Sequence, residues 1–198
     1  MFNSFSLGIG ADGVPGYPLI EAYLTGKELK TVAEIDASVS DLMTSARLYM
    51  YGLQFTYNPH RMILNRVTDV YLLDADGNRR ELEDDKLYRV VADLYSGQML
   101  SAVTKTSYGL LSVVPKKADG TPIENFEDVI LTDNGGELKA WTAIAHYMES
   151  FPDENGDGIA DIPQYYAGLH ERKVVDDSAN LIKLIKNPNK YAVMIAGI

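Results

Sequence analysis

Short segments that alternate between apolar and polar residues dominate the first half of the chain. The segment 19–24 has this pattern, which is typical of a β-strand with one buried face. Asp74-Ala-Asp-Gly77-Asn78 separates two such segments and is typical of a hairpin turn. The other expected strands cover 48–57, 66–73, 79–82, 87–94 and 110–114.

Helical periodicity begins directly after the first expected strand. Thr25-Gly-Lys-Glu28 is a capping box, so we expect a helix that runs through Ile35 towards Met43. The clearest amphipathic helix lies over 137–151, where apolar residues recur on one face. This face consists of Leu138, Trp141, Ala145 and Met148. Shorter helices are expected over 97–103 and 178–185.

Helices therefore interleave with strands that are joined by hairpins. This order predicts an α+β fold, with a mixed β-sheet and packed helices, rather than a doubly wound parallel sheet. No linker-like change in composition divides the chain, so we expect a single domain over 1–198.

The charge and the cysteine content of the chain exclude several classes of function. The formal net charge is −10, which would repel DNA or RNA, so we expect no nucleic-acid partner. The sequence has no cysteine, which excludes disulfides, cysteine-ligated zinc and a cysteine nucleophile.

The last eight residues, Tyr191–Ile198, are uncharged and almost wholly apolar. Two interpretations are open: a final core strand, or the start of a membrane anchor that continues beyond Ile198. A membrane-spanning helix needs about 20 apolar residues, so we expect no membrane contact by this chain itself.

Three segments in register resemble the C-terminal domain of the 5′-nucleotidase family, which includes UDP-sugar hydrolases and cyclic-nucleotide phosphodiesterases. The first, Pro18–Lys30, is a strand that enters a capped helix through Leu-Thr-Gly. The second, Tyr51–Pro59, is similar to a Gly-Leu-x-Phe-x-Tyr-Asp-Pro strand, and Arg66-Val67 follows it. The third, Leu87–Leu94, is similar to a Tyr-x-Val-x-Thr-Asn-Asp strand. The resemblance is best over 8–115, and 134–190 is more divergent, helical and carries an acidic loop.

The resemblance implies a substrate-recognition domain of a secreted or surface phosphoric ester hydrolase that acts in nucleotide catabolism. Family enzymes have an N-terminal metallophosphatase domain with two divalent metal ions, and this domain of the parent chain is the implied partner. The C-terminal domain binds the nucleoside or nucleotide by stacking the base between aromatic rings. None of the three histidines stands in a family metal-ligand motif, so this chain by itself is expected to be inactive. The implied location is extracytoplasmic.

The resemblance also implies a set of substrate-binding residues, namely Tyr17, Asp93, Tyr95 and Tyr108. The segment after Asp93 lacks the family's Gly-Gly-Asp-Gly-Phe loop and its stacking aromatic, so Tyr95 or Tyr108 is expected to supply a ring instead. The other stacking position falls on Tyr17. The alternative is that these are ordinary tyrosines in a chain that contains thirteen.

A separate motif after the long helix has the spacing D-x-N-x-D-G-x-x-D, which suits a calcium ion because hard cations prefer alternating oxygen ligands. The expected ligands are the side chains of Asp153, Asn155, Asp157 and Asp161 and the carbonyl of Ile159. The alternative is a solvated acidic turn.

Three functions from different classes follow. The first is substrate recognition for a nucleotide-hydrolysing enzyme. The second is a non-catalytic surface module of the same fold, which the missing aromatic loop favours and which calcium would stabilise. The third, a stand-alone enzyme, is disfavoured because no nucleophile–base or metal constellation is present.

Overall fold

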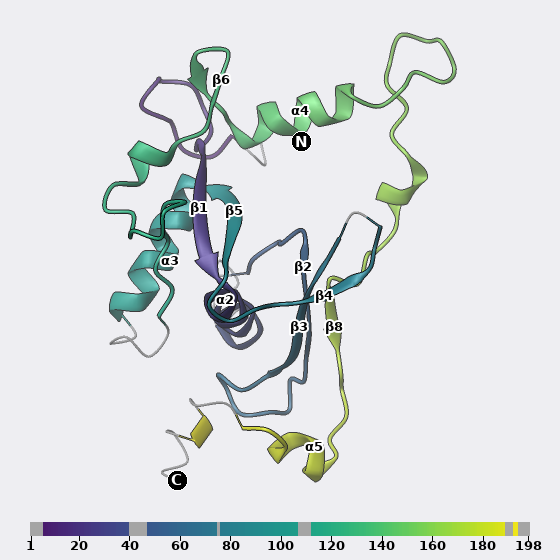
Figure 1. Ribbon diagram of the computed structural model, residues 1–198. Coiled ribbons are helices and arrows are strands. Elements are labelled where there is room, and N and C mark those ends of the chain that lie inside the picture. The colour runs from purple at the N-terminus through teal and green to yellow at the C-terminus, as the bar shows by residue number, and fades with distance from the viewer. Residues whose placement is uncertain (1–5, 40–46, 75, 107–111, 189–191, 194–198) are drawn as a thin grey trace. The chain divides into compact units, whose positions relative to one another are not determined.

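The computed structural model of the protein describes residues 6–39, 47–74, 76–106, 112–188 and 192–193 (Figure 1). The chain divides into two compact units. The first combines Met1–Tyr23, Arg89–Ala102 and Val114–His170. The second combines Leu24–Tyr88, Val103–Val113 and Glu171–Ile198. The single domain expected over 1–198 stays a prediction.

Helices are interspersed with runs of strands along the described chain. The strands are β1 (Leu19–Thr25), β2 (Leu53–Tyr57), β3 (Val67–Leu73), β4 (Arg79–Glu81), β5 (Leu87–Asp93), β6 (Thr132–Asp133), β7 (Gly136–Glu137) and β8 (Lys173–Val175). The α-helices are α2 (Gly26–Val39), α3 (Leu94–Thr106), α4 (Ala140–Glu149) and α5 (Leu181–Ile185). Within the described residues, 3₁₀ helices cover Phe126–Val129 and Gln164–Ala167. None of the described helices is long and apolar enough to cross a membrane.

The largest described sheet is mixed and has the strand order β4-β3-β2-β8. Strand β3 pairs antiparallel with β2 and β4, whereas β8 pairs parallel with β2. Strands β1 and β5 form a separate pair, and β6 and β7 form a short antiparallel hairpin. A mixed sheet with packed helices confirms the α+β fold expected from the sequence.

The junction between β1 and α2 explains the threonine and the glycine of the Leu-Thr-Gly motif. The hydroxyl of Thr25 accepts a hydrogen bond from the Glu28 amide, and the Glu28 carboxylate accepts one from the Thr25 amide at 2.8 Å. These reciprocal bonds confirm the capping box. A Cβ at Gly26 would lie 2.3 Å from the carbonyl oxygen of Glu83, so only glycine fits there.

Each unit has its own apolar core. In the first unit, Ile20 and Ala22 of β1 pack with Ile123 and Phe126. In the second unit, most of the buried apolar residues come from α2, from β2 and β3, and from the turn after β4. They include Leu29, Val32, Ile35, Leu53, Phe55, Val70 and Leu82. Helix α2 lies against β3.

Some element boundaries differ from those expected. Helix α3 begins at Leu94, before the expected position 97, because the Asp93 carboxylate accepts hydrogen bonds from the amide and hydroxyl of Ser96. Helix α4 begins at Ala140 because the residues before it form the hairpin β6–β7. Strand β2 begins only at Leu53. The expected extension of α2 towards Met43 lies outside the described residues, as do positions 110 and 111 of the strand expected over 110–114. Residues 112–114 are described and do not form a strand, so the expectation is wrong there.

Candidate functional site

Two of the predicted ligand-stacking residues meet in the first unit. The rings of Tyr17 and Tyr95 are stacked, with centroids 5.7 Å apart and an angle of 23° between the ring planes. Tyr17 precedes β1, and Tyr95 lies in the first turn of α3. The amide of Leu94 donates a hydrogen bond of 2.8 Å to the carbonyl of Pro18, which joins the residues next to each tyrosine.

Tyr17 belongs to a hairpin-like loop, the 7–17 loop. Its ends are paired by hydrogen bonds from the Gly16 amide to the Gly8 carbonyl and from the Tyr17 amide to the Leu7 carbonyl, at 2.9 and 3.0 Å. Gly8 has a φ of +76° and lies against the Tyr17 ring, since a Cβ there would be 2.4 Å from Tyr17 Cζ. The loop therefore holds the Tyr17 ring between Gly8 and Tyr95.

The spacing of the two rings decides how a planar ligand would bind. A base inserted between them requires about 7 Å, two carbon contact distances, which exceeds the observed 5.7 Å. Tyr95 is 50% exposed, so its ring is accessible. The pair can bind a planar group on the exposed Tyr95 ring as it stands, or between the rings after a separation of about 1 Å.

The other two predicted substrate-binding residues have different outcomes. The carboxylate of Asp93 accepts hydrogen bonds from Ser96 at 2.8 and 2.6 Å, so it caps α3 directly beside Tyr95. Its role towards a ligand stays a prediction. Tyr108 lies outside the described residues.

The acidic loop 153–161 is closed by its own side chains. Asp153 accepts hydrogen bonds from the amides of Gly158 and Gly156, which hold the pKa of its carboxyl below the ordinary value. Asp161 accepts from the Glu154 amide, which joins the two ends of the loop. In the described part of the chain, no group of three or more His, Cys, Asp or Glu residues is arranged to hold a metal ion. The expected ligands Asp153, Asn155, Asp157, Ile159 and Asp161 stay a prediction.

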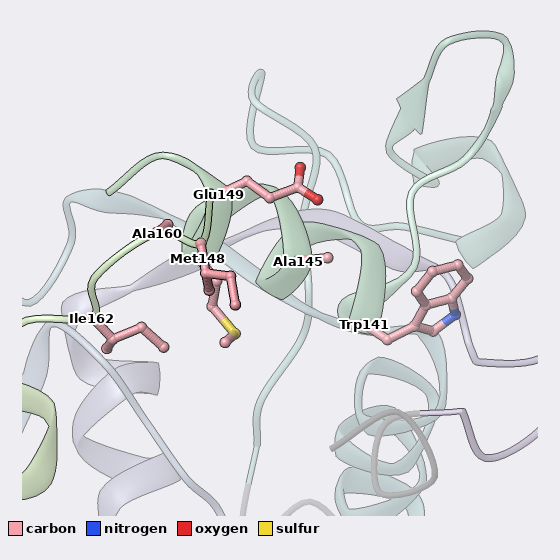
Figure 2. Close-up of a pocket in the computed structure, with 7 residues that line it drawn as sticks. Trp141, Ala145, Met148, Glu149, Ala160 and Ile162 are labelled. Carbon is pink, nitrogen blue, oxygen red and sulfur yellow. The ribbon is translucent and has the colours of Figure 1, made fainter. Parts of the chain in front are cut away.

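The apolar face expected on α4 lines an open cavity of about 400 Å³. Trp141, Ala145 and Met148 lie along the same side of the helix, opposite Ile162 from the following loop (Figure 2). No residue of α4 is buried. The sequence pattern therefore predicted the shared face, although the described chain does not bury it.

Sequence reasoning missed the residues that hold the 7–17 loop in place. The indole nitrogen of Trp141 donates a hydrogen bond of 3.0 Å to the Pro15 carbonyl. Lys139 is 1% exposed, and its ammonium group pairs with Asp12 and Glu137. A single lysine beside an amphipathic helix gives no sequence signal of burial. The glycines at 8 and 10 indicated only a loop.

Comparison with known proteins identifies the part of the chain that carries this site. Residues 16–103 match the model of the family described as 5′-nucleotidase, C-terminal domain. These residues belong to that family. The matched part of the chain includes Tyr17, Asp93 and Tyr95, and it lies within the segment 8–115 expected to match best.

One solved structure supports the fold. A 5′-nucleotidase precursor from Thermus thermophilus is 20% identical and superposes with a TM-score of 0.51 over 80% of this chain. The match covers 25% of that protein, so this chain spans about a quarter of its length. The NAD nucleotidase of Haemophilus influenzae is 22% identical over 48% of this chain and 19% of its own, with a TM-score of 0.36. No curated protein sequence matches the chain.

Proposed function

We propose that this chain is the nucleoside- or nucleotide-recognition domain of a 5′-nucleotidase-type phosphoesterase. The observation that carries the proposal is the Tyr17–Tyr95 stack. It joins two segments that are distant in sequence, and both lie inside the part that matches the nucleotidase C-terminal family. A pair of aromatic rings selects a flat base, because stacking recognises the face of the ring system rather than its edge.

The base, rather than the phosphate, is the group that this site recognises. The chain carries a net charge of −10, which opposes a free phosphate ester unless local cations compensate. In this proposal the phosphate points towards a metallophosphatase domain of the parent protein, where two metal ions activate water and neutralise the phosphoryl oxygens. This chain then contributes binding and orientation, and it does not hydrolyse the ester by itself.

The proposal includes the setting in which the protein acts. A hydrolase that releases phosphate from extracellular nucleotides acts in nucleotide catabolism outside the cytoplasm. This proposal is supported by the absence of cysteine, which suits an extracytoplasmic protein but does not require one. In this setting calcium is abundant, and the loop 153–161 is proposed as its binding site.

Titration of the 198-residue chain with adenosine, AMP and UDP-glucose tests the recognition site. With ¹³C-labelled tyrosine rings, the NMR signals of Tyr17 and Tyr95 are expected to shift. The substitutions Tyr17→Leu and Tyr95→Leu are expected to weaken binding about 5- to 150-fold, since stacking of one base contributes about 1–3 kcal/mol. Tyr49→Leu is the matched control, because Tyr49 is 89% exposed and lies in the second unit.

The same experiment separates the proposal from a non-catalytic surface module that has lost its base site. If neither Tyr17 nor Tyr95 responds to about 10 mM of any of the three compounds, the recognition function is wrong and the surface module is favoured. Equal weakening by Tyr49→Leu would show that the effect is not specific to the stacked pair.

A further inference from the structure

The 7–17 loop is anchored at several points to the residues that lead into α4. We propose that Lys139 is a positioning residue for the Tyr17–Tyr95 pair, acting through the tip of the loop. This inference rests on the proposed function, because it explains how the aromatic pair is kept ready for a planar ligand.

Lys139 is a buried cation with two carboxylate partners. Its side chain is 2% exposed, and its Nζ atom lies 2.9 Å from Asp12 Oδ1 and 2.5 Å from Glu137 Oε2. Glu137 lies two residues away in the same segment, whereas Asp12 comes from the tip of the loop. Burial of an unpaired ammonium group is strongly unfavourable. The position of Lys139 therefore depends on that of Asp12, and the position of Asp12 depends on that of Lys139.

The same oxygen of Asp12 also closes the turn at the tip. Asp12 Oδ1 accepts a hydrogen bond of 2.9 Å from the Val14 amide as well as the one from Lys139. The loop backbone lies directly on the ion cluster, since a Cβ at Gly10 would be 2.1 Å from Lys139 Nζ and 2.0 Å from Glu137 Oε2. The same Asp12 oxygen therefore both closes the turn at the tip of the loop and attaches the tip to Lys139.

Two further contacts from the same segment flank Tyr17 on both sides. Trp141 donates a hydrogen bond to the carbonyl of Pro15, two residues before Tyr17. Pro18, the residue after Tyr17, forms a backbone bridge with Lys139. The segment 137–141 thus fixes the chain before and after Tyr17. Lys139 contributes on both sides, through its ion pair with Asp12 and its backbone bridge with Pro18.

A directional ion cluster gives a positional constraint that an apolar contact would not give. Replacement of a buried ion pair by apolar groups often leaves stability unchanged, so stability alone does not explain a lysine here. A fixed loop holds Tyr17 in its stacked position before a ligand arrives, which lowers the conformational entropy lost on binding.

The first test uses Asp12→Asn, which retains an acceptor for the Val14 amide but removes the charge that faces Lys139. We expect the affinity for adenosine to fall at least about threefold, and the contacts between the Tyr17 and Tyr95 rings in nuclear Overhauser spectra to weaken. Lys139→Met is expected to give the larger loss, and Lys139→Arg is expected to restore part of it. Asp119→Asn is the control, because Asp119 closes an exposed turn of the same unit through Thr121.

The ring contacts separate a failure of this inference from a failure of the proposed function. If the unsubstituted protein binds none of adenosine, AMP and UDP-glucose, the proposed function is wrong, and the ring contacts still show whether Asp12 and Lys139 hold Tyr17. If Asp12→Asn retains both the ring contacts and the affinity of the unsubstituted protein, the positioning role is overturned, whether or not Lys139→Met folds. Equal losses in Asp119→Asn would overturn it as well.

Discussion

Gly8 lies against the ring of Tyr17 at a distance that leaves no room for a side chain. A Cβ at position 8 would be 2.4 Å from Tyr17 Cζ and 2.6 Å from both Cε atoms. The same glycine has a φ of +76°, in the region that disfavours other residues. The position of the Tyr17 ring therefore depends on the absence of a side chain at position 8.

We expect Gly8→Ala to displace the Tyr17 ring and to disrupt its stacking on Tyr95. The displacement should weaken ligand binding and lower the free energy of unfolding by more than the ~1 kcal/mol that alanine costs in left-handed backbone. Gly13→Ala is the matched control, because Gly13 has a φ of +74° and nothing within 4 Å of its added Cβ. Equal effects of the two substitutions on ring contacts and on urea unfolding would contradict the prediction.

The buried carboxylate of Glu34 offers a second test, in the second unit. Glu34 is 4% exposed and accepts hydrogen bonds from Ser38 Oγ and from the amides of Arg66 and Val67. We expect Glu34→Gln to destabilise the fold by about 2–3 kcal/mol in urea unfolding, because the new amide group turns a donor towards one of these donors. Glu81→Gln, on an exposed strand, should change stability by less than about 0.5 kcal/mol.

Calcium binding by the loop 153–161 is tested by calorimetry and thermal unfolding. With the weak affinity of extracellular calcium modules, about 10 mM Ca²⁺ should stabilise the protein by about 1.5–3 kcal/mol. Asp153→Asn should abolish the effect, whereas Asp119→Asn should retain it. If this concentration of Ca²⁺ produces no binding heat and no change in melting temperature, the loop does not bind calcium.

The ionisation of Asp12 reports the state of the 7–17 loop. The Val14 amide, together with Lys139, holds the pKa of the Asp12 carboxyl below its ordinary value. Because the folded-state pKa is depressed, the contribution of Asp12 to stability is fully present above the unfolded value of about 3.9, and it is lost as the pH falls through the folded pKa. Carboxyl ¹³C titration should therefore give a pKa below that of an unfolded reference peptide.

The variant Lys139→Met refines this titration. Its Asp12 pKa should rise, yet stay below the ordinary value, because the hydrogen bond from Val14, the larger cause, remains. An unchanged Asp12 pKa in this variant would show that Lys139 does not act on the loop tip.

Local sequence signals predicted the elements that local interactions form. The capping box of Thr25 and Glu28 identified the start of α2, because both partners lie within one helical turn. The turn over 74–78 is closed by the hydrogen bond from the Asp74 amide to the Asn78 carbonyl. Helix α3 begins at Leu94 rather than at the expected position 97 because Asp93, which the resemblance indicated only as a substrate-binding residue, accepts capping hydrogen bonds from Ser96.

The sequence by itself determined the α+β class, the β1–α2 junction and the family resemblance, since these depend on residues close together in the chain. Only the tertiary structure placed β1 and β5 in one sheet and β2 in another. It also brought Tyr17 to Tyr95 and Asp12 to Lys139. Such pairs depend on how distant segments pack, and neither residue type nor spacing along the chain records that packing.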